Sequence, residues 1–230
     1  MEFGKSFTYV FEDDDWIVKI LLAAVIAFIP IIGPLAVAGW GVEISKRAIQ
    51  KDPEQLPDWS DFVNYLVKGL VVILIGFVYM LPVIVVQVCN NSVFFFSQES
   101  GEEGLMIIGN ILMACFGCLS FIYAILVVFF IAAAIGRYAD TGEVGSAFQF
   151  GKVFATVKAA PAPYLMVLLG GFLAGMIAFV GLIACIIGVF FTVAYANAIN
   201  AHLMGQAYYE AKLALSGDND QQQEVTLASQ

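Results

Sequence analysis

Apolar residues gather in four long blocks along the chain, and short polar segments separate the blocks. A helix needs about 20 apolar residues to cross the roughly 30 Å hydrocarbon core of a bilayer. Each block is long enough for at least one such helix. The blocks cover residues 16–49, 69–89, 105–135 and 164–203. The pattern therefore predicts an all-α fold, a polytopic bundle of transmembrane helices.

The last block is too long for one span, because its 40 residues would form a helix of about 60 Å. A break near Val180 and Gly181 divides it into two spans. Together with the two middle blocks, this predicts spans over 69–89, 105–136, 164–180 and 182–209.

The first block is interrupted by the sequence FIPIIGPL, which contains Pro30, Gly33 and Pro34. A residue that precedes proline avoids the α-helical region, and proline is favoured in the first turn of a new helix. These three residues set the topology by predicting a hairpin over 16–50, broken at Pro30–Pro34. Its arms are short, so it is either a full hairpin or re-entrant, and a single kinked span remains the alternative. With the hairpin, the bundle has about six membrane helices.

Two segments between the blocks show apolar residues at helical spacing on one face only. In 58–67 the face includes Trp59 and Phe62, and in 143–158 it includes Phe150 and Phe154. Such stripes predict interfacial amphipathic helices, with these four aromatic residues as anchors at the membrane surface.

The chain ends differ from the apolar blocks. Residues 1–15 predict a surface segment, without the pattern of a cleavable signal peptide. The polar segment 216–230 is typical of a disordered tail. Residues 1–215 therefore form a single predicted integral membrane domain.

Charge is distributed unevenly between the connecting segments. The 90–104 loop has three Glu and neither Lys nor Arg, whereas 46–68 and 137–158 contain seven of the ten basic residues. Because Lys and Arg favour the cytoplasmic side, this predicts that the loop faces out and that both termini are cytoplasmic.

The composition agrees with a chain that has the lipid bilayer as its solvent. It is 61% hydrophobic and 13% charged, against about 25% charged residues in ordinary soluble domains. A basic patch or stripe is absent from the sequence, so we do not expect nucleic-acid binding.

The chemistry-bearing residues are few. The sequence contains one histidine, His202, and no recognisable catalytic set, metal-ligand spacing or phosphate-binding loop. We therefore expect no catalytic residues, no metal site and no cofactor.

Polar uncharged residues near the end of the last block are the remaining candidates for a site. They are Asn197, Asn200, His202 and Gln206, and they predict either a polar pocket or amides that bridge neighbouring helices. Gly171 and Gly175 form a Gly-x-x-x-Gly pair that predicts close helix packing.

Several motifs resemble a known family. They are IPIIG at 29–33, LPDW at 56–59, RYADTGEVGSAFQFG from Arg137 and NAHLMGQAYYEA from Asn200. Over about residues 7–212 the chain is similar to an uncharacterised prokaryotic membrane family, domain of unknown function 4013. The resemblance implies a multi-pass protein of a bacterial or archaeal inner membrane, and it implies no activity.

Three hypotheses for function follow. The first is a non-enzymatic scaffold or accessory subunit that binds membrane components, with a membrane-protein partner or as a homo-oligomer. The second is a transporter or channel for a neutral or lipid-like solute. The third, a membrane enzyme, would require His202 to converge with a carboxylate such as Glu43 or Asp61.

Overall fold

The computed structural model describes residues 1–54, 56–183 and 185–228. All regular elements in these ranges are helices, so the chain has the predicted all-α fold. The elements are α1 Lys5–Thr8, the 3₁₀ helix η1 Tyr9–Glu12, α2 Trp16–Ala27, α3 Ile32–Gln50, α4 Phe62–Glu99, α5 Glu103–Thr141, α6 Val144–Ala147, α7 Phe150–Ala159, α8 Pro161–Ile183 and α9 Cys185–Ala228.

The FIPIIGPL sequence separates α2 from α3, and the chain turns sharply between them. Ile31, the residue that precedes α3, has a positive φ of 69°. This conformation lies outside the right-handed helical region and keeps α2 and α3 separate. A Cβ atom on Gly33 would clash with the carbonyl of Ile26, so only glycine allows the two helices to approach here. The structure therefore has a helical hairpin at 16–50 and not one kinked helix.

The body of the molecule is built around α3 and α9. Gly39 and Gly69 face the backbone of the opposite helix where α3 crosses α4, and a Cβ atom on either would clash with it. Ser45 of α3 donates a hydrogen bond to the carbonyl of Ala201 in α9 (2.7 Å). The largest fully buried side chains include Trp40, Ile44, Tyr164, Ile199 and Leu203.

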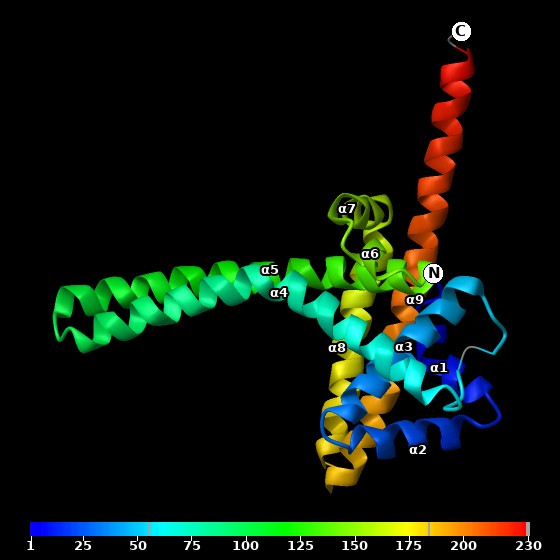
Figure 1. Cartoon of the computed structure of the whole chain (residues 1–230), viewed down its shortest axis with the longest axis horizontal. Helices are drawn as coiled ribbons and strands as arrows, with labels where there is room; N and C mark the ends of the chain where they lie inside the picture. Colours follow the sequence, from blue (N-terminus) through cyan, green and yellow to red (C-terminus); the bar gives the residue numbers. More distant parts are fainter. Residues whose placement is uncertain (55, 184, 229–230) are drawn as a thin grey trace.

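The α4–α5 hairpin extends far beyond this body (Figure 1). Its outer part, residues 80–126, is called the arm below. The buried residues of the arm are Asn90, Ser97, Gly109 and Ser120, so they are polar or glycine. Many of its apolar side chains are exposed instead, among them Phe96 and Phe121. This inside-out arrangement is what a lipid environment favours.

Two predicted interfacial helices differ from the observed ones. Residues 62–67 are the first turns of α4, because the sequence has no helix breaker between them and the span that follows. The 143–158 segment is divided into α6 and α7. Their buried residues are Ser146, Ala147, Val153 and Thr156.

The end of the chain also differs from the expectation. α9 continues through the polar segment as far as Ala228, whereas disorder was expected for 216–230. The run Gln221–Glu224 and the pair Leu227–Ala228 have good helix propensity, whereas the expectation rested on the low hydrophobicity of the segment. Residues 229–230 of the predicted tail lie outside the described residues.

Three of the described helices are long and apolar enough to cross a membrane. They are Phe62–Glu99, Glu103–Thr141 and Pro161–Gly181, and the shorter Trp16–Ala27 is also apolar. The chain is thus a membrane protein by the length and composition of its helices. The number of six membrane helices stays a prediction.

Candidate functional site

Residues 1–15, called the strap below, cover the middle of α9. Tyr195 of α9 donates a hydrogen bond to the carbonyl of Phe7. Tyr9 donates to the carbonyl of Ala198 (3.0 Å). Burial raises the pKa of the Tyr9 hydroxyl well above its usual value, so this hydroxyl remains a neutral donor. The strap is therefore held by specific bonds to the helix beneath it.

His202 lies under the strap and is almost completely buried, with 1% of its surface exposed. The ring of Tyr9 stacks on the imidazole, with centroids 4.2 Å apart and planes at 12°. Ser6 Oγ lies 2.9 Å from Nδ1. These contacts fix the position of the imidazole.

The tautomer of His202 follows from its neighbour Gln206. The amide N–H of Glu2 donates to Gln206 Oε1 (2.7 Å), which identifies the other amide atom as the nitrogen. That nitrogen lies 3.1 Å from His202 Nδ1 and can only donate. Nδ1 is therefore an acceptor, and the proton of the neutral ring is on Nε2. Nε2 has no hydrogen-bond partner among the described residues.

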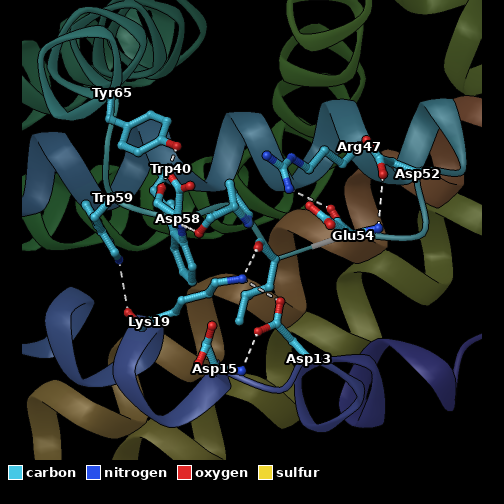
Figure 2. A network of polar contacts seen from close by, with 12 residues as sticks. Asp13, Asp15, Lys19, Trp40, Arg47, Asp52, Glu54, Asp58, Trp59 and Tyr65 are labelled. Carbon is cyan, nitrogen blue, oxygen red and sulfur yellow. Dashed lines mark hydrogen bonds and ion pairs between the residues drawn. The ribbon is translucent and has the colours of Figure 1, made fainter.

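Residues 51–61, called the loop below, are attached to α2 and α3 by two tryptophans (Figure 2). Trp40 Nε1 donates to the carbonyl of Pro57 (2.9 Å), and Trp59 Nε1 donates to the carbonyl of Lys19 (3.0 Å). The two indoles stack with centroids 5.3 Å apart. Trp59 thus stabilises the loop, although the sequence predicted it as a surface anchor.

Lys19 connects the strap to the loop. Its ammonium group donates to Asp13 Oδ2 (2.6 Å) and to the carbonyl of Leu56 (3.0 Å). Asp58 of the loop accepts hydrogen bonds from the hydroxyl and the amide of Ser60, and these lower its carboxyl pKa. The carboxylate of Asp58 is consequently charged at neutral pH.

Two adjoining polar cavities lie between the strap and the loop. One has a volume of about 550 Å³, and His202, Gln206, Lys5 and Lys51 are among its lining residues. The other has a volume of about 400 Å³ and is lined mainly by acidic residues. Glu12 and Pro53 line both cavities, which makes the two cavities one groove. This groove is the candidate functional site.

The structure separates the four residues of the predicted polar pocket. His202 and Gln206 line the larger cavity. Asn197 Nδ2 instead donates to the carbonyl of Val37 in α3 (3.0 Å). Asn200 lies against Gly171 of α8. The two asparagines therefore lie between helices, which is the alternative that the sequence left open.

The two glycines of the predicted Gly-x-x-x-Gly pair also differ in their surroundings. A Cβ atom on Gly171 would lie 3.1 Å from the side chain of Asn200, and one on Gly175 would meet no atom of the described residues within 4 Å. The close packing of α8 on α9 occurs at Gly170, where a Cβ atom would clash with Leu203. Gly170 and Gly171 therefore both face α9, with the closer approach at Gly170, and Gly175 lies away from this contact.

The anchors predicted in α7 lie beside the base of the arm. Phe150 and Phe154 are 56% and 58% exposed. Phe150 is 5.3 Å from the ring of Tyr79, and Phe154 is 6.2 Å from that of Phe130. Phe62, the fourth predicted anchor, is half-buried at the start of α4.

The family model of a protein of unknown function, DUF4013, matches residues 22–189. The chain belongs to this family. The family resemblance seen in the sequence is thereby confirmed. No curated protein and no solved structure matches the chain significantly. The matched range includes the loop, but it does not include the strap, His202 or Gln206.

The acidic residues of the groove had not been recognised as a site from the sequence. The available signal was the run from Glu12 to Asp15, followed by acidic residues at 52, 54 and 58. Only the fold brings these two segments together. Among the described residues, no group of three or more His, Cys, Asp or Glu side chains is arranged to hold a metal ion.

The groups that the enzyme hypothesis would combine have separate partners. Glu43 accepts from Lys68 in α4. Asp61 accepts from Asn64 Nδ2 (2.8 Å). His202 contacts Ser6, Tyr9 and Gln206. What the groove offers is binding chemistry: carboxylates, ammonium groups and one N–H donor.

Proposed function

We propose that this DUF4013 protein is a non-enzymatic scaffold or accessory subunit of a bacterial or archaeal inner membrane. In this proposal the arm crosses the bilayer and presents its apolar outer faces to other membrane components, which are either a partner protein or a second copy. The observation that carries the proposal is the arm itself, in which two helices extend beyond the body with their apolar side chains outward (Figure 1).

The length of the arm supports a transmembrane position. The part of α4 in the arm has 20 residues, from Met80 to Glu99, which corresponds to about 30 Å. This equals the thickness of the hydrocarbon core. The aromatic pairs of Tyr79 with Phe150 and Phe130 with Phe154 lie where the arm leaves the body. Aromatic residues are typical of such a membrane interface.

Charge supports the orientation. The tip of the arm carries Glu99, Glu102 and Glu103, and the basic residues Arg137, Lys152 and Lys158 lie near its base in sequence. The base and both termini are then cytoplasmic, and the tip faces out.

A site on the arm supports a helical or lipid neighbour. An apolar cavity of about 230 Å³ is lined by Pro82, Phe116, Ser120 and Tyr123, among others. Ser120 Oγ is buried and has no hydrogen-bond partner in the part of the chain that the structure describes. Pro82 has no N–H, so it also removes one helical hydrogen bond from α4. A second component beside this face would complete its packing.

The arrangement of the cavities favours binding over transport. A solute path requires several helices around one polar passage, and the arm consists of two helices. The polar groove is formed by the strap, the loop and α9 and not by the arm. Transport of a neutral or lipid-like solute remains the second candidate, and the experiment below distinguishes it.

The test is purification of the tagged protein from its own membranes in mild detergent, with proteins and lipids identified by mass spectrometry. Phe96→Ala with Phe121→Ala removes two arm side chains that are 71% and 68% exposed. The matched control, Phe172→Ala with Phe179→Ala, removes two α8 side chains that are 69% and 67% exposed. We expect a stoichiometric protein partner that the arm variant loses and the α8 variant keeps. A lone monomer with a defined solute would refute the scaffold and favour transport.

The orientation is tested separately by thiol labelling of intact cells in a variant without native cysteines. We expect an impermeant reagent to label Glu102→Cys at the tip and not Lys5→Cys in the strap. Labelling of Lys5→Cys would place the strap outside and contradict the proposed topology.

A further inference from the structure

The groove between strap and loop is strongly acidic. Nine carboxylates line it, about half of the 19 in the chain: Glu2, Glu12, Asp13, Asp14, Asp15, Asp52, Glu54, Asp58 and Glu210. Three lysines line it as well, Lys5, Lys19 and Lys51. A cleft with an excess of one sign concentrates its field and attracts ligands of the opposite charge.

The cations neutralise only part of this excess, since the N-terminal ammonium group pairs with Glu210 (2.6 Å) and each lysine reaches at most one carboxylate. Lys19 is bound to Asp13 and to a backbone carbonyl. Lys51 lies over the ring of Tyr209, 4.4 Å from its centroid. Lys5 is 4.0 Å from Glu2. The exposed carboxylates of Glu12, Asp14 and Glu54 have no ion-pair partner among the described residues.

His202 gives a second, independent indication of the ligand. Its side chain is almost completely buried and lines the larger cavity. Gln206 fixes its proton on Nε2, which has no acceptor among the described residues. A bare metal ion or a polyamine has no acceptor to offer to this N–H group. A peptide offers backbone carbonyls in addition to cationic side chains.

We propose that the acidic groove binds a segment rich in Lys and Arg that flanks a transmembrane helix of a partner protein. The basic side chains would pair with the carboxylates of the strap and the loop, and a backbone carbonyl would accept from His202. Cytoplasmic segments next to membrane helices are enriched in Lys and Arg, which makes this partner chemistry common on that side. The proposal deepens the proposed function and rests on it.

The test is binding of a fluorescein-labelled decapeptide with alternating Lys and Ala to the full chain in nanodiscs, followed by fluorescence anisotropy. A peptide with Gln in place of Lys is the negative control. The variant Glu12→Gln, Asp14→Asn, Glu54→Gln removes three groove charges that make no ion pair. The matched variant Glu99→Gln, Glu102→Gln, Glu103→Gln removes three exposed charges at the tip of the arm. We expect the groove variant to bind the Lys peptide about tenfold or more weakly, and the tip variant to bind it as the unmodified chain does.

Three outcomes would overturn the proposal. They are no binding of the Lys peptide, an equal loss in both variants, and competition by spermidine at the same concentration as the peptide. Thermal unfolding of both variants checks that they are folded. If purification finds a protein partner that the groove variant still binds, the proposed role of the groove is refuted and the proposed scaffold function is not. Absence of any partner would refute the scaffold, whatever the peptide does.

Discussion

Replacing Trp40 by Phe should release the loop from the body while the arm stays intact. Trp40 is fully buried, and its indole N–H is bonded to the buried carbonyl of Pro57. Phenylalanine leaves that carbonyl unpaired, which costs about 1–3 kcal/mol. The weaker stacking on Trp59 adds about 1 kcal/mol. The change should therefore destabilise the closed loop by about 2–4 kcal/mol.

Hydrogen exchange followed by mass spectrometry measures this effect segment by segment. Since about 1.4 kcal/mol corresponds to a factor of ten, exchange of residues 51–61 should accelerate by about 30-fold or more. Exchange in the arm, residues 80–126, should not change. Trp16→Phe is the control, because Trp16 is only partly buried and donates no side-chain hydrogen bond among those described. Unchanged exchange of the loop in Trp40→Phe would refute the argument that this indole holds it.

Two further predictions concern contacts inside the body. Gly39→Val should lower the free energy of unfolding by about 3 kcal/mol or more, because its side chain would clash with the backbone of α4 near Tyr65. The unfolding temperature should fall accordingly. Gly76→Val is the control and should be close to neutral, because a Cβ atom there meets no described atom within 4 Å. Similar melting curves for the two variants would contradict the close contact of α3 with α4 at Gly39. Lys68→Met leaves the largely buried Glu43 without its close partner and should cost about 1–3 kcal/mol. Lys46→Met removes a more exposed partner of Glu43, 3.8 Å away, and should cost less than 1 kcal/mol in the same thermal unfolding assay. An equal loss of stability in Lys68→Met and Lys46→Met would refute this prediction.

The helical architecture follows from local signals in the sequence. Apolar blocks predict the helices because a membrane helix is encoded by a contiguous run of residues. The break at Pro30 and Gly33 is likewise a local effect of proline and glycine. The boundaries at Phe62 and Phe150 were less predictable, since an amphipathic stripe looks the same in a separate surface helix and in the first turns of a longer one.

The groove was not predictable in the same way, because its two sides are about 40 residues apart in the sequence. Asp14 and Glu54 lie on the same groove only because Lys19 and Trp59 tie α2 to the loop. The orientation of helix faces is also not local. Gly170 and Gly171 both approach α9, at Leu203 and Asn200, whereas Gly175 meets no described atom within 4 Å. A Gly-x-x-x-Gly spacing cannot decide which of its glycines lies at the contact.

Two surfaces of opposite character support the proposal of a scaffold over that of a transporter. The arm is apolar outside and extends from one side of the body, while the strap and the loop lie on the other side (Figure 1). In a transporter the polar and apolar linings would enclose one continuous path. Here the polar groove is bounded by the strap, the loop and α9, and the apolar cavity lies between α4 and α5. Surfaces placed apart in this way suit a protein that joins a component within the membrane to a basic segment at its inner face.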